Sequence, residues 1–139
     1  MLHITKRVTF SASHKLWSTH YSDQENMKIY GQCANPNGHG HNYVLEVTVA
    51  GVPDPKTGMI MNFDVLKQIM ISEIVEHVDH KHLNMDVPWL SNVIPTAEEL
   101  VKIFWMRLQN KLPSGKLYRI RLSETENNYT EYFGETHAA

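Results

Sequence analysis

The chain has 139 residues, of which 42% are hydrophobic and 20% are charged, and its formal net charge is −2. This size and balance fit a single globular domain over residues 1–139 and exclude a disordered or fibrous chain. The basic residues are scattered, which argues against nucleic acid as a partner. No apolar run approaches the roughly 20 residues that a membrane span requires, so we expect no membrane partner either.

The cysteine and histidine content indicates the cellular compartment of the protein and the kind of chemistry that it could carry out. The single cysteine, Cys33, allows no intramolecular disulfide and fits a reducing environment. Residues 1–7 lack the apolar core of a signal peptide, so we expect a cytoplasmic protein. Nine histidines, several of them close together, depart from average composition in a way that is typical of metal proteins.

The first half of the chain predicts two strands around a long loop. Residues 2–14 alternate between apolar and polar positions, with His14 on the parity of the apolar face. Residues 15–40 show no sustained period and contain an Asn-Pro-Asn-Gly turn signal, so we expect a long functional loop. Alternation returns over 39–50, with His41 on the apolar face of the second strand.

The second half predicts two helices and two strands. Asn62 can cap a helix whose apolar positions recur at helical spacing. These positions are Phe63, Leu66, Ile69, Met70 and Ile74. A second helix begins after Pro95, where Thr96 and Glu99 form a capping-box pattern. Two final strands are expected around 116–124 and 129–134.

The resulting order is β-β-α-α-β-β in one α+β domain, with a four-stranded antiparallel sheet and two helices on one face. Two helices cover only one face of such a sheet. The other face and both sheet edges need cover, because an open edge exposes unpaired backbone groups. We therefore expect a homo-oligomer.

The strongest local signal is the Gly-His-Gly-His stretch that contains His39 and His41. Residues two apart on a strand point to the same side, so both imidazoles face one point, and His14 could add a third. Three histidines leave the fourth position of a tetrahedral zinc ion open, which is the catalytic pattern. The alternatives are a chance His-X-His pair, or a metal site formed by His77 and His80 at the end of the first helix.

Three further features carry chemistry, each with a plainer alternative. Cys33 is either a small buried hydrophobe or a thiol with a lowered pKa, and its position alone favours the first. Asp79 and His80 are either a base with its orienting partner or polar residues at a helix end, and again the residues alone favour the plainer interpretation. Glu124 lies at a position of its strand that should face the apolar side, where a buried carboxylate without hydrogen-bond donors is costly. It therefore either lies at an exposed strand end or binds a ligand with paired N–H groups, such as a 2-amino-4-oxo pyrimidine.

Taken together, the motifs resemble the 6-pyruvoyl-tetrahydropterin synthase family over essentially the whole chain. The matching stretches are Phe10-Ser11-Ala12-Ser13-His14, residues 33–42, residues 54–59, Asp79-His80-Lys81, Pro95-Thr96 and residues 124–128. The resemblance implies the tunnelling fold, in which trimers of β-β-α-α-β-β subunits close a twelve-stranded barrel and two trimers stack as a hexamer. It also implies that the active sites lie between subunits.

The resemblance implies a reaction and its cofactors. His14, His39 and His41 resemble the ligands of one zinc ion per subunit, and magnesium is needed alongside zinc. The implied reaction is the conversion of 7,8-dihydroneopterin triphosphate to 6-pyruvoyl-tetrahydropterin by a lyase, with release of inorganic triphosphate. The implied partners are therefore a pterin triphosphate substrate and further copies of the chain.

The same resemblance assigns roles to the remaining motif residues. Cys33 resembles the thiolate that abstracts a proton, and Asp79 and His80 resemble the pair that relays protons with it. Glu124 resembles the residue that anchors the pterin ring and belongs to the catalytic set. Thr96 belongs to the substrate-binding set with it.

Spacing distinguishes branches of the family. Five residues separate Cys33 from His39, which resembles the pyruvoyl-forming branch. The 6-carboxy-5,6,7,8-tetrahydropterin synthases of the queuosine pathway usually have three, and a third branch replaces the cysteine with glutamate. His82 and Asn84 depart from the animal pattern. The alternative functions are a 6-carboxy-tetrahydropterin synthase and, in another class, a non-catalytic metal- or pterin-binding protein on the same fold.

Overall fold

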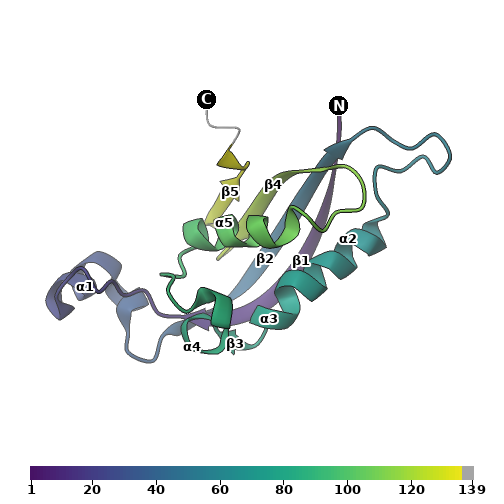
Figure 1. The fold of residues 1–139 in the computed structure, drawn as a ribbon. Helices are drawn as coiled ribbons and strands as arrows, with labels where there is room; N and C mark the ends of the chain where they lie inside the picture. Colours follow the sequence, from purple (N-terminus) through teal and green to yellow (C-terminus); the bar gives the residue numbers. More distant parts are fainter. Residues whose placement is uncertain (136–139) are drawn as a thin grey trace.

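The computed structural model describes residues 1–135 and has an antiparallel sheet of long strands at its centre (Figure 1). Strand β1 (Leu2–His14) pairs with β2 (His39–Gly51) along its whole length. Strand β4 (Lys116–Ser123) pairs with β2, and β5 (Tyr129–Tyr132) pairs with β4, in both cases antiparallel. The predicted α+β class and its four antiparallel strands are confirmed.

A fifth strand was not predicted. Strand β3 (Lys81–His82) adds to the free edge of β1 in parallel, next to Ala12 and Ser13, so the sheet order is β3-β1-β2-β4-β5. The prediction of a four-stranded, wholly antiparallel sheet is therefore wrong at this edge. Two residues are too few to show an alternating pattern in sequence.

The predicted first helix is one continuous helical segment in three parts. These are α2 (Phe63–Met70), the π-helical turn η2 (Ile71–Val75) and α3 (Glu76–Val78). The segment begins as predicted, where the Asn62 side chain accepts a hydrogen bond from the backbone N–H of Asp64 at 2.7 Å.

The apolar stripe of this segment is confirmed except at its first residue. Leu66, Met70 and Ile74 are fully buried, whereas Phe63 is 49% exposed. A side chain on a helix points back over the preceding turn. Phe63 is the first residue of the helix, so it has no preceding turn to place its ring against the core.

Helix α5 (Ala97–Leu108) lies on the same face of the sheet, and its predicted capping box forms only in part. The Thr96 hydroxyl accepts a hydrogen bond from the backbone N–H of Glu99 at 3.2 Å. The return bond is absent, because the backbone N–H of Thr96 donates to the Ile94 carbonyl at 2.8 Å. The Glu99 carboxylate pairs instead with Lys102 at 3.0 Å. The short α4 (Leu83–Asp86) and the 3-10 helix η3 (Pro88–Leu90) connect β3 to this helix.

The predicted loop between β1 and β2 contains a helix, which corrects the sequence prediction. Residues 15–38, here called the excursion, include α1 (Asp23–Tyr30) and the 3-10 helix η1 (Gly31–Ala34). A complete capping box starts α1, formed by Ser22 and Glu25. The helix buries only the polar residue Asn26, so no apolar period marks it in the sequence. Figure 1 shows that α1 projects beyond the end of the sheet.

The core lies between the sheet and the two long helical segments, and it leads to the candidate site. Alternate residues of β1 and β2 face it, and Phe10 stacks on Tyr43 with ring centroids 4.9 Å apart. Beyond this pair, the core face of β2 continues with His41 and His39, and the core face of β1 continues with Ala12 and then His14. Within residues 1–135, no helix has the length and apolar character needed to cross a membrane.

Candidate metal centre

The register of β1 and β2 places three histidines together. His14 lies opposite His39, and Ala12 lies opposite His41. Because alternate residues share a face, all three imidazoles lie on the core side at one end of the sheet. One nitrogen from each ring lies within 4.8 Å of the others, so the group could hold a metal ion.

His14 is fixed by its surroundings. Its side chain is fully buried, and its Nδ1 lies 2.8 Å from the Pro95 carbonyl, which can only accept a hydrogen bond. The proton is therefore on Nδ1, and Nε2 is left to face the other imidazoles, 3.3 Å from Nε2 of His39. The Tyr43 hydroxyl lies 3.4 Å from the same Nδ1. Such contacts behind a ligand set its tautomer and ring orientation in metal sites.

Electrostatics favour the neutral rings that metals require. Burial lowers the pKa of His14 and the pKa of His41, although the nearby Glu124 carboxylate opposes the shift in both. Neutral imidazole is the metal-binding form of histidine. The Nδ1 of His39 and the Nε2 of His41 are buried with no hydrogen-bond partner. The lowered pKa of His14 and of His41, together with the unsatisfied Nε2 of His41, fits a metal ion at this group.

Two more of the predicted residues lie at this group. Glu124 follows directly after β4, and its carboxylate is 3.5 Å from Nε2 of His41. The Sγ of Cys33 lies 3.7 Å from Nε2 of His39. Burial, and secondarily the Glu124 charge, raise the pKa of the Cys33 thiol. The structure therefore brings a thiol and a carboxylate to the three imidazoles.

Asp79 and His80 lie elsewhere, at the β1 edge of the sheet. The Asp79 carboxylate accepts a hydrogen bond from the backbone N–H of Ser11 at 2.9 Å, which is the main reason that its pKa is lowered. Its other oxygen lies 3.0 Å from Nδ1 of His80, whose side chain is 82% exposed. No hydrogen bond among the described residues joins this pair to Cys33. Within one chain, the predicted proton-relay pair is separate from the thiol.

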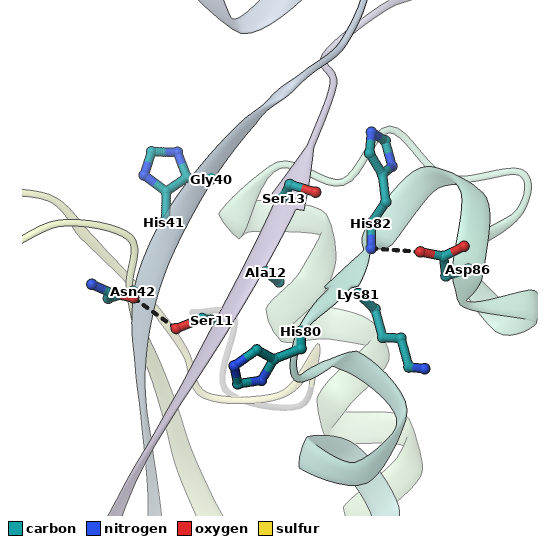
Figure 2. Close-up of a pocket in the computed structure, with 10 residues that line it drawn as sticks. All are labelled: Ser11, Ala12, Ser13, Gly40, His41, Asn42, His80, Lys81, His82 and Asp86. Carbon is teal, nitrogen blue, oxygen red and sulfur yellow. Dashed lines mark hydrogen bonds between the residues drawn. The ribbon is translucent and has the colours of Figure 1, made fainter.

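The His80 ring borders an open hollow of about 520 Å³ on the sheet face that the long helices leave uncovered. Figure 2 shows His80 beside Ser11, whose hydroxyl donates to Asn42 at 2.7 Å, while the His41 ring is turned away beyond β2. Hydroxyl, amide and imidazole groups thus form a second polar surface near the cluster of three histidines. The backbone N–H of His82, also at this hollow, donates to Asp86 at 2.9 Å.

The alternative metal site at His77 and His80 gains no support. The Nε2 of His77 lies 3.1 Å from the Ser72 carbonyl and 3.4 Å from the Arg107 guanidinium. His80 turns instead towards Asp79. The two imidazoles thus have separate partners.

Thr96, predicted to bind substrate, is the N-cap of α5 and follows Pro95, whose carbonyl holds His14. Two contacts behind the metal group escaped the sequence analysis. The contact with the Pro95 carbonyl could not be predicted from sequence, because every residue has a backbone carbonyl and none of them is marked by residue type. Tyr43 could have been found, since it lies two residues after His41 and so faces the same side of β2.

The core face of this α+β sheet ends in three imidazoles that could hold a metal ion, beside a thiol and a carboxylate, which are functional groups typical of an enzyme. The family model described as 6-pyruvoyl tetrahydropterin synthase matches residues 3–135. The chain belongs to this family, and the resemblance predicted from its motifs is confirmed.

Individual relatives agree with the family match. The chain is 50% identical to the 6-pyruvoyl tetrahydrobiopterin synthase of Pongo abelii, with 95% of this chain and 91% of that protein covered. It is 29% identical to a 6-carboxy-5,6,7,8-tetrahydropterin synthase of Aquifex aeolicus, covering 93% and 96%. The solved 6-pyruvoyl tetrahydropterin synthase of Caenorhabditis elegans superposes with a TM-score of 0.90 at 35% identity, covering 96% of both chains. The predicted tunnelling fold of the single subunit is confirmed.

Proposed function

We propose that the chain is a zinc-dependent lyase that converts 7,8-dihydroneopterin triphosphate to 6-pyruvoyl-tetrahydropterin and releases triphosphate. The observation that carries the proposal is the assembly of three imidazoles, the Cys33 thiol and the Glu124 carboxylate at one end of the sheet. The 50% identity to a protein named for this product supports the assignment.

His14, His39 and His41 are the proposed zinc ligands, with one ion per chain. Three histidines leave one tetrahedral position open for substrate. Zinc bound there supplies a Lewis acid that polarises substrate oxygens. The Pro95 carbonyl keeps the Nε2 of His14 free for this role, because it holds the ring proton on Nδ1.

Cys33 and Glu124 have separate roles in the proposal. A thiolate at Cys33 takes up a proton from the substrate side chain, and zinc held by the neighbouring imidazoles would favour this form against the effect of burial. The Glu124 carboxylate accepts two N–H bonds from the pterin edge. It thereby orients the ring so that the side chain reaches Cys33. Thr96, beside Pro95, completes the substrate-binding set.

We further propose that Asp79 and His80 act on the site of a neighbouring chain in a hexamer. The exposed His80 ring lies apart from its own Cys33 and is available to another copy. Strand β3 covers β1 only at Ala12 and Ser13, so most of that edge is unpaired, and β5 forms the other edge. Pairing these edges between copies would cover both and join the two parts of the site.

Magnesium and location complete the proposal. The triphosphate of the substrate would carry the magnesium ion, because this metal binds phosphate oxygens more readily than all-protein cages. A cysteine that acts as a base must stay reduced, and this favours the cytoplasm as the location.

The 6-carboxy-tetrahydropterin synthase activity is the second candidate, because it uses the same site. Two observations favour the pyruvoyl product. The spacing of Cys33 and His39 matches that branch, and the identity to its members reaches 50% against 29% for the Aquifex aeolicus protein.

Mass spectrometry of the product formed from 7,8-dihydroneopterin triphosphate, with zinc-loaded protein and magnesium, tests the proposal. We expect 6-pyruvoyl-tetrahydropterin from the unaltered chain and at least a hundredfold slower turnover from Cys33→Ala, with zinc retained, as an order-of-magnitude expectation for a lost proton-transfer group. A dominant carboxy product would assign the second candidate. Unchanged turnover by Cys33→Ala would remove the thiol from the mechanism.

A further inference from the structure

The excursion carries Cys33, and Ala34 is its one buried apolar residue among the described residues. It leaves β1 after His14 and returns to β2 at His39, so it connects two of the three histidines. No residue of 15–38 belongs to the core cluster of the described residues. Helix α1 leaves Met27 46% exposed and Ile29 53% exposed. Apart from the small side chain of Ala34, apolar burial therefore does not set the shape of this segment.

A single buried amide fills the interior of the excursion instead. Asn26 is fully buried, and its Oδ1 accepts a hydrogen bond from the backbone N–H of Ser18 at 2.7 Å. Its Nδ2 lies within hydrogen-bond distance of three carbonyls, those of Ser18 at 2.9 Å, Ser22 at 3.0 Å and Tyr21 at 3.2 Å. The side chain thus fixes the course of the backbone over 18–22 relative to α1. A buried network whose members are all satisfied specifies one conformation.

The order imposed by Asn26 continues to Cys33. Helix α1 runs directly into η1, which contains Cys33, through Gly31 at a φ of +57°. The backbone N–H of Leu16 donates to the Cys33 carbonyl at 2.7 Å and closes the base of the excursion. Cys33 is therefore held from two sides: by this hydrogen bond next to β1, and by the helix that Asn26 ties to the backbone of residues 18–22.

We propose that Asn26 is the positioning residue that places the Cys33 thiol beside the three histidines, an inference that rests on the proposed function for its effect on turnover. The role requires an amide of this length. Aspartate has no N–H to donate and would place a carboxylate against three carbonyl oxygens, and an unsatisfied buried polar group is costly. Cys33 would then move while the histidines, held on β1 and β2, keep their places.

The test compares Asn26→Asp with Gln24→Glu, which makes the same change of amide to carboxylate at an exposed position of the same helix. Four quantities are measured: zinc per chain, the rate at which iodoacetamide alkylates Cys33, kcat and KM. We expect Asn26→Asp to keep one zinc per chain and a KM within a few-fold of the control. Its kcat should fall on the order of 100-fold, the effect of a displacement of about 1 Å at reacting groups. The alkylation rate should change several-fold.

Asn26→Ala, which removes the amide without adding a charge, is the second variant and should show the same pattern. Alkylation rates and kcat equal to those of Gln24→Glu in both variants would overturn the proposal. Loss of zinc, or loss of cooperative unfolding in both variants, would also overturn it, because the excursion would then support the whole site or the core. If the unaltered chain does not turn over the pterin triphosphate but alkylation still responds to Asn26, the proposed function fails and the positioning role stands.

Discussion

The buried imidazole of His14 and the partly buried imidazole of His41 make the stability of the metal-free protein depend on pH. Burial lowers the pKa of both, whereas an unfolded histidine has a pKa of about 6.5. As the pH falls below that value, the unfolded chain binds protons before the folded chain does. Stability should therefore be fully present above about pH 6.5 and decline below it. Thermal unfolding of chelator-treated protein at several pH values measures this.

A control separates these two histidines from exposed ones. His20→Asn, at an exposed position, should keep the pH dependence of the unaltered chain. His14→Gln should reduce it. Equal slopes in the two variants would show that burial of His14 is not the cause.

Glu124 is predicted to bind substrate and not the metal. Glu124→Gln keeps the size of the side chain but loses the charge and half of the acceptor capacity. A hydrogen bond to a charged group contributes about 1.5–3 kcal/mol, so the substrate dissociation constant should rise on the order of 10- to 100-fold. Zinc content should stay at one per chain, because the three imidazoles remain. Isothermal titration and metal analysis measure the two quantities, and a zinc-free variant would contradict the assignment.

The sequence was sufficient to predict that the three histidines cluster, but not which other side chains lie beside them. Alternation put His14, His39 and His41 on core faces, and pairing of consecutive strands then brings them together. Cys33 has no such periodicity, because its position depends on hydrogen bonds within an irregular excursion. Only family resemblance assigned it a role. The resemblance grouped His80 with Cys33 and placed the active sites between subunits, but the separation of the two residues within one chain was not predicted.

At the scale of elements, the turn that leads into β2 links two proposed zinc ligands. Gly38 has a φ of +72°, and a Cβ placed on it would lie 2.7 Å from the His14 carbonyl oxygen. Gly58 has a φ of +74° with open space around it. Both glycines therefore adopt a positive φ, but only at Gly38 would a Cβ atom clash with a neighbouring group.

We predict that Gly38→Ala weakens zinc binding and that Gly58→Ala does not. Each variant pays the cost of an alanine at positive φ, roughly 1–2 kcal/mol. Only Gly38→Ala also pushes the His14 carbonyl and the start of β2 apart. Its thermal midpoint should fall further, and its zinc affinity, measured against a competing chelator, should fall at least several-fold. Equal zinc affinity in the two variants would show that the turn is free to adjust.

Elements were predictable where the chain buries a regular apolar pattern. Strands β1 and β2 and helix α5 follow such patterns. Helix α1 buries an asparagine, and β3 has two residues, so neither has a period to detect. Helix propensity alone is a weak guide, since tertiary hydrogen bonds decide whether so short a helix forms.

At the scale of the whole molecule, one chain has both halves of the proposed site but not together. The Asp79–His80 pair lies at the β1 edge, where His80 borders the face that the long helices leave uncovered. The histidines with Cys33 and Glu124 lie at the same end of the sheet but on its core face. A head-to-tail arrangement that closes into a ring would bring the edge of one copy to its neighbour. In the proposed ring, pairing between neighbouring copies would both cover the open sheet edges and complete each site.

Complementation between inactive variants tests this arrangement. Cys33→Ala lacks the thiol, and His80→Ala lacks the relay imidazole, so each alone should be inactive. If the two groups of one site come from different chains, subunits exchanged between the variants should form some intact sites, about a quarter of the total in a random mixture of a closed ring. Activity should therefore appear on mixing after mild dissociation and reassembly, and should be absent when each variant is treated alone.

The control for this experiment is a pair of variants from one half of the site. Mixing Cys33→Ala with Glu124→Ala should restore nothing if both groups serve the same chain's histidines, as their distances to His39 and His41 indicate. Recovery in that pair would place Glu124 across the subunit boundary. No recovery in the first pair, with subunit exchange shown by mass spectrometry, would mean that His80 serves its own chain. The excursion would then have to move to bring Cys33 to it.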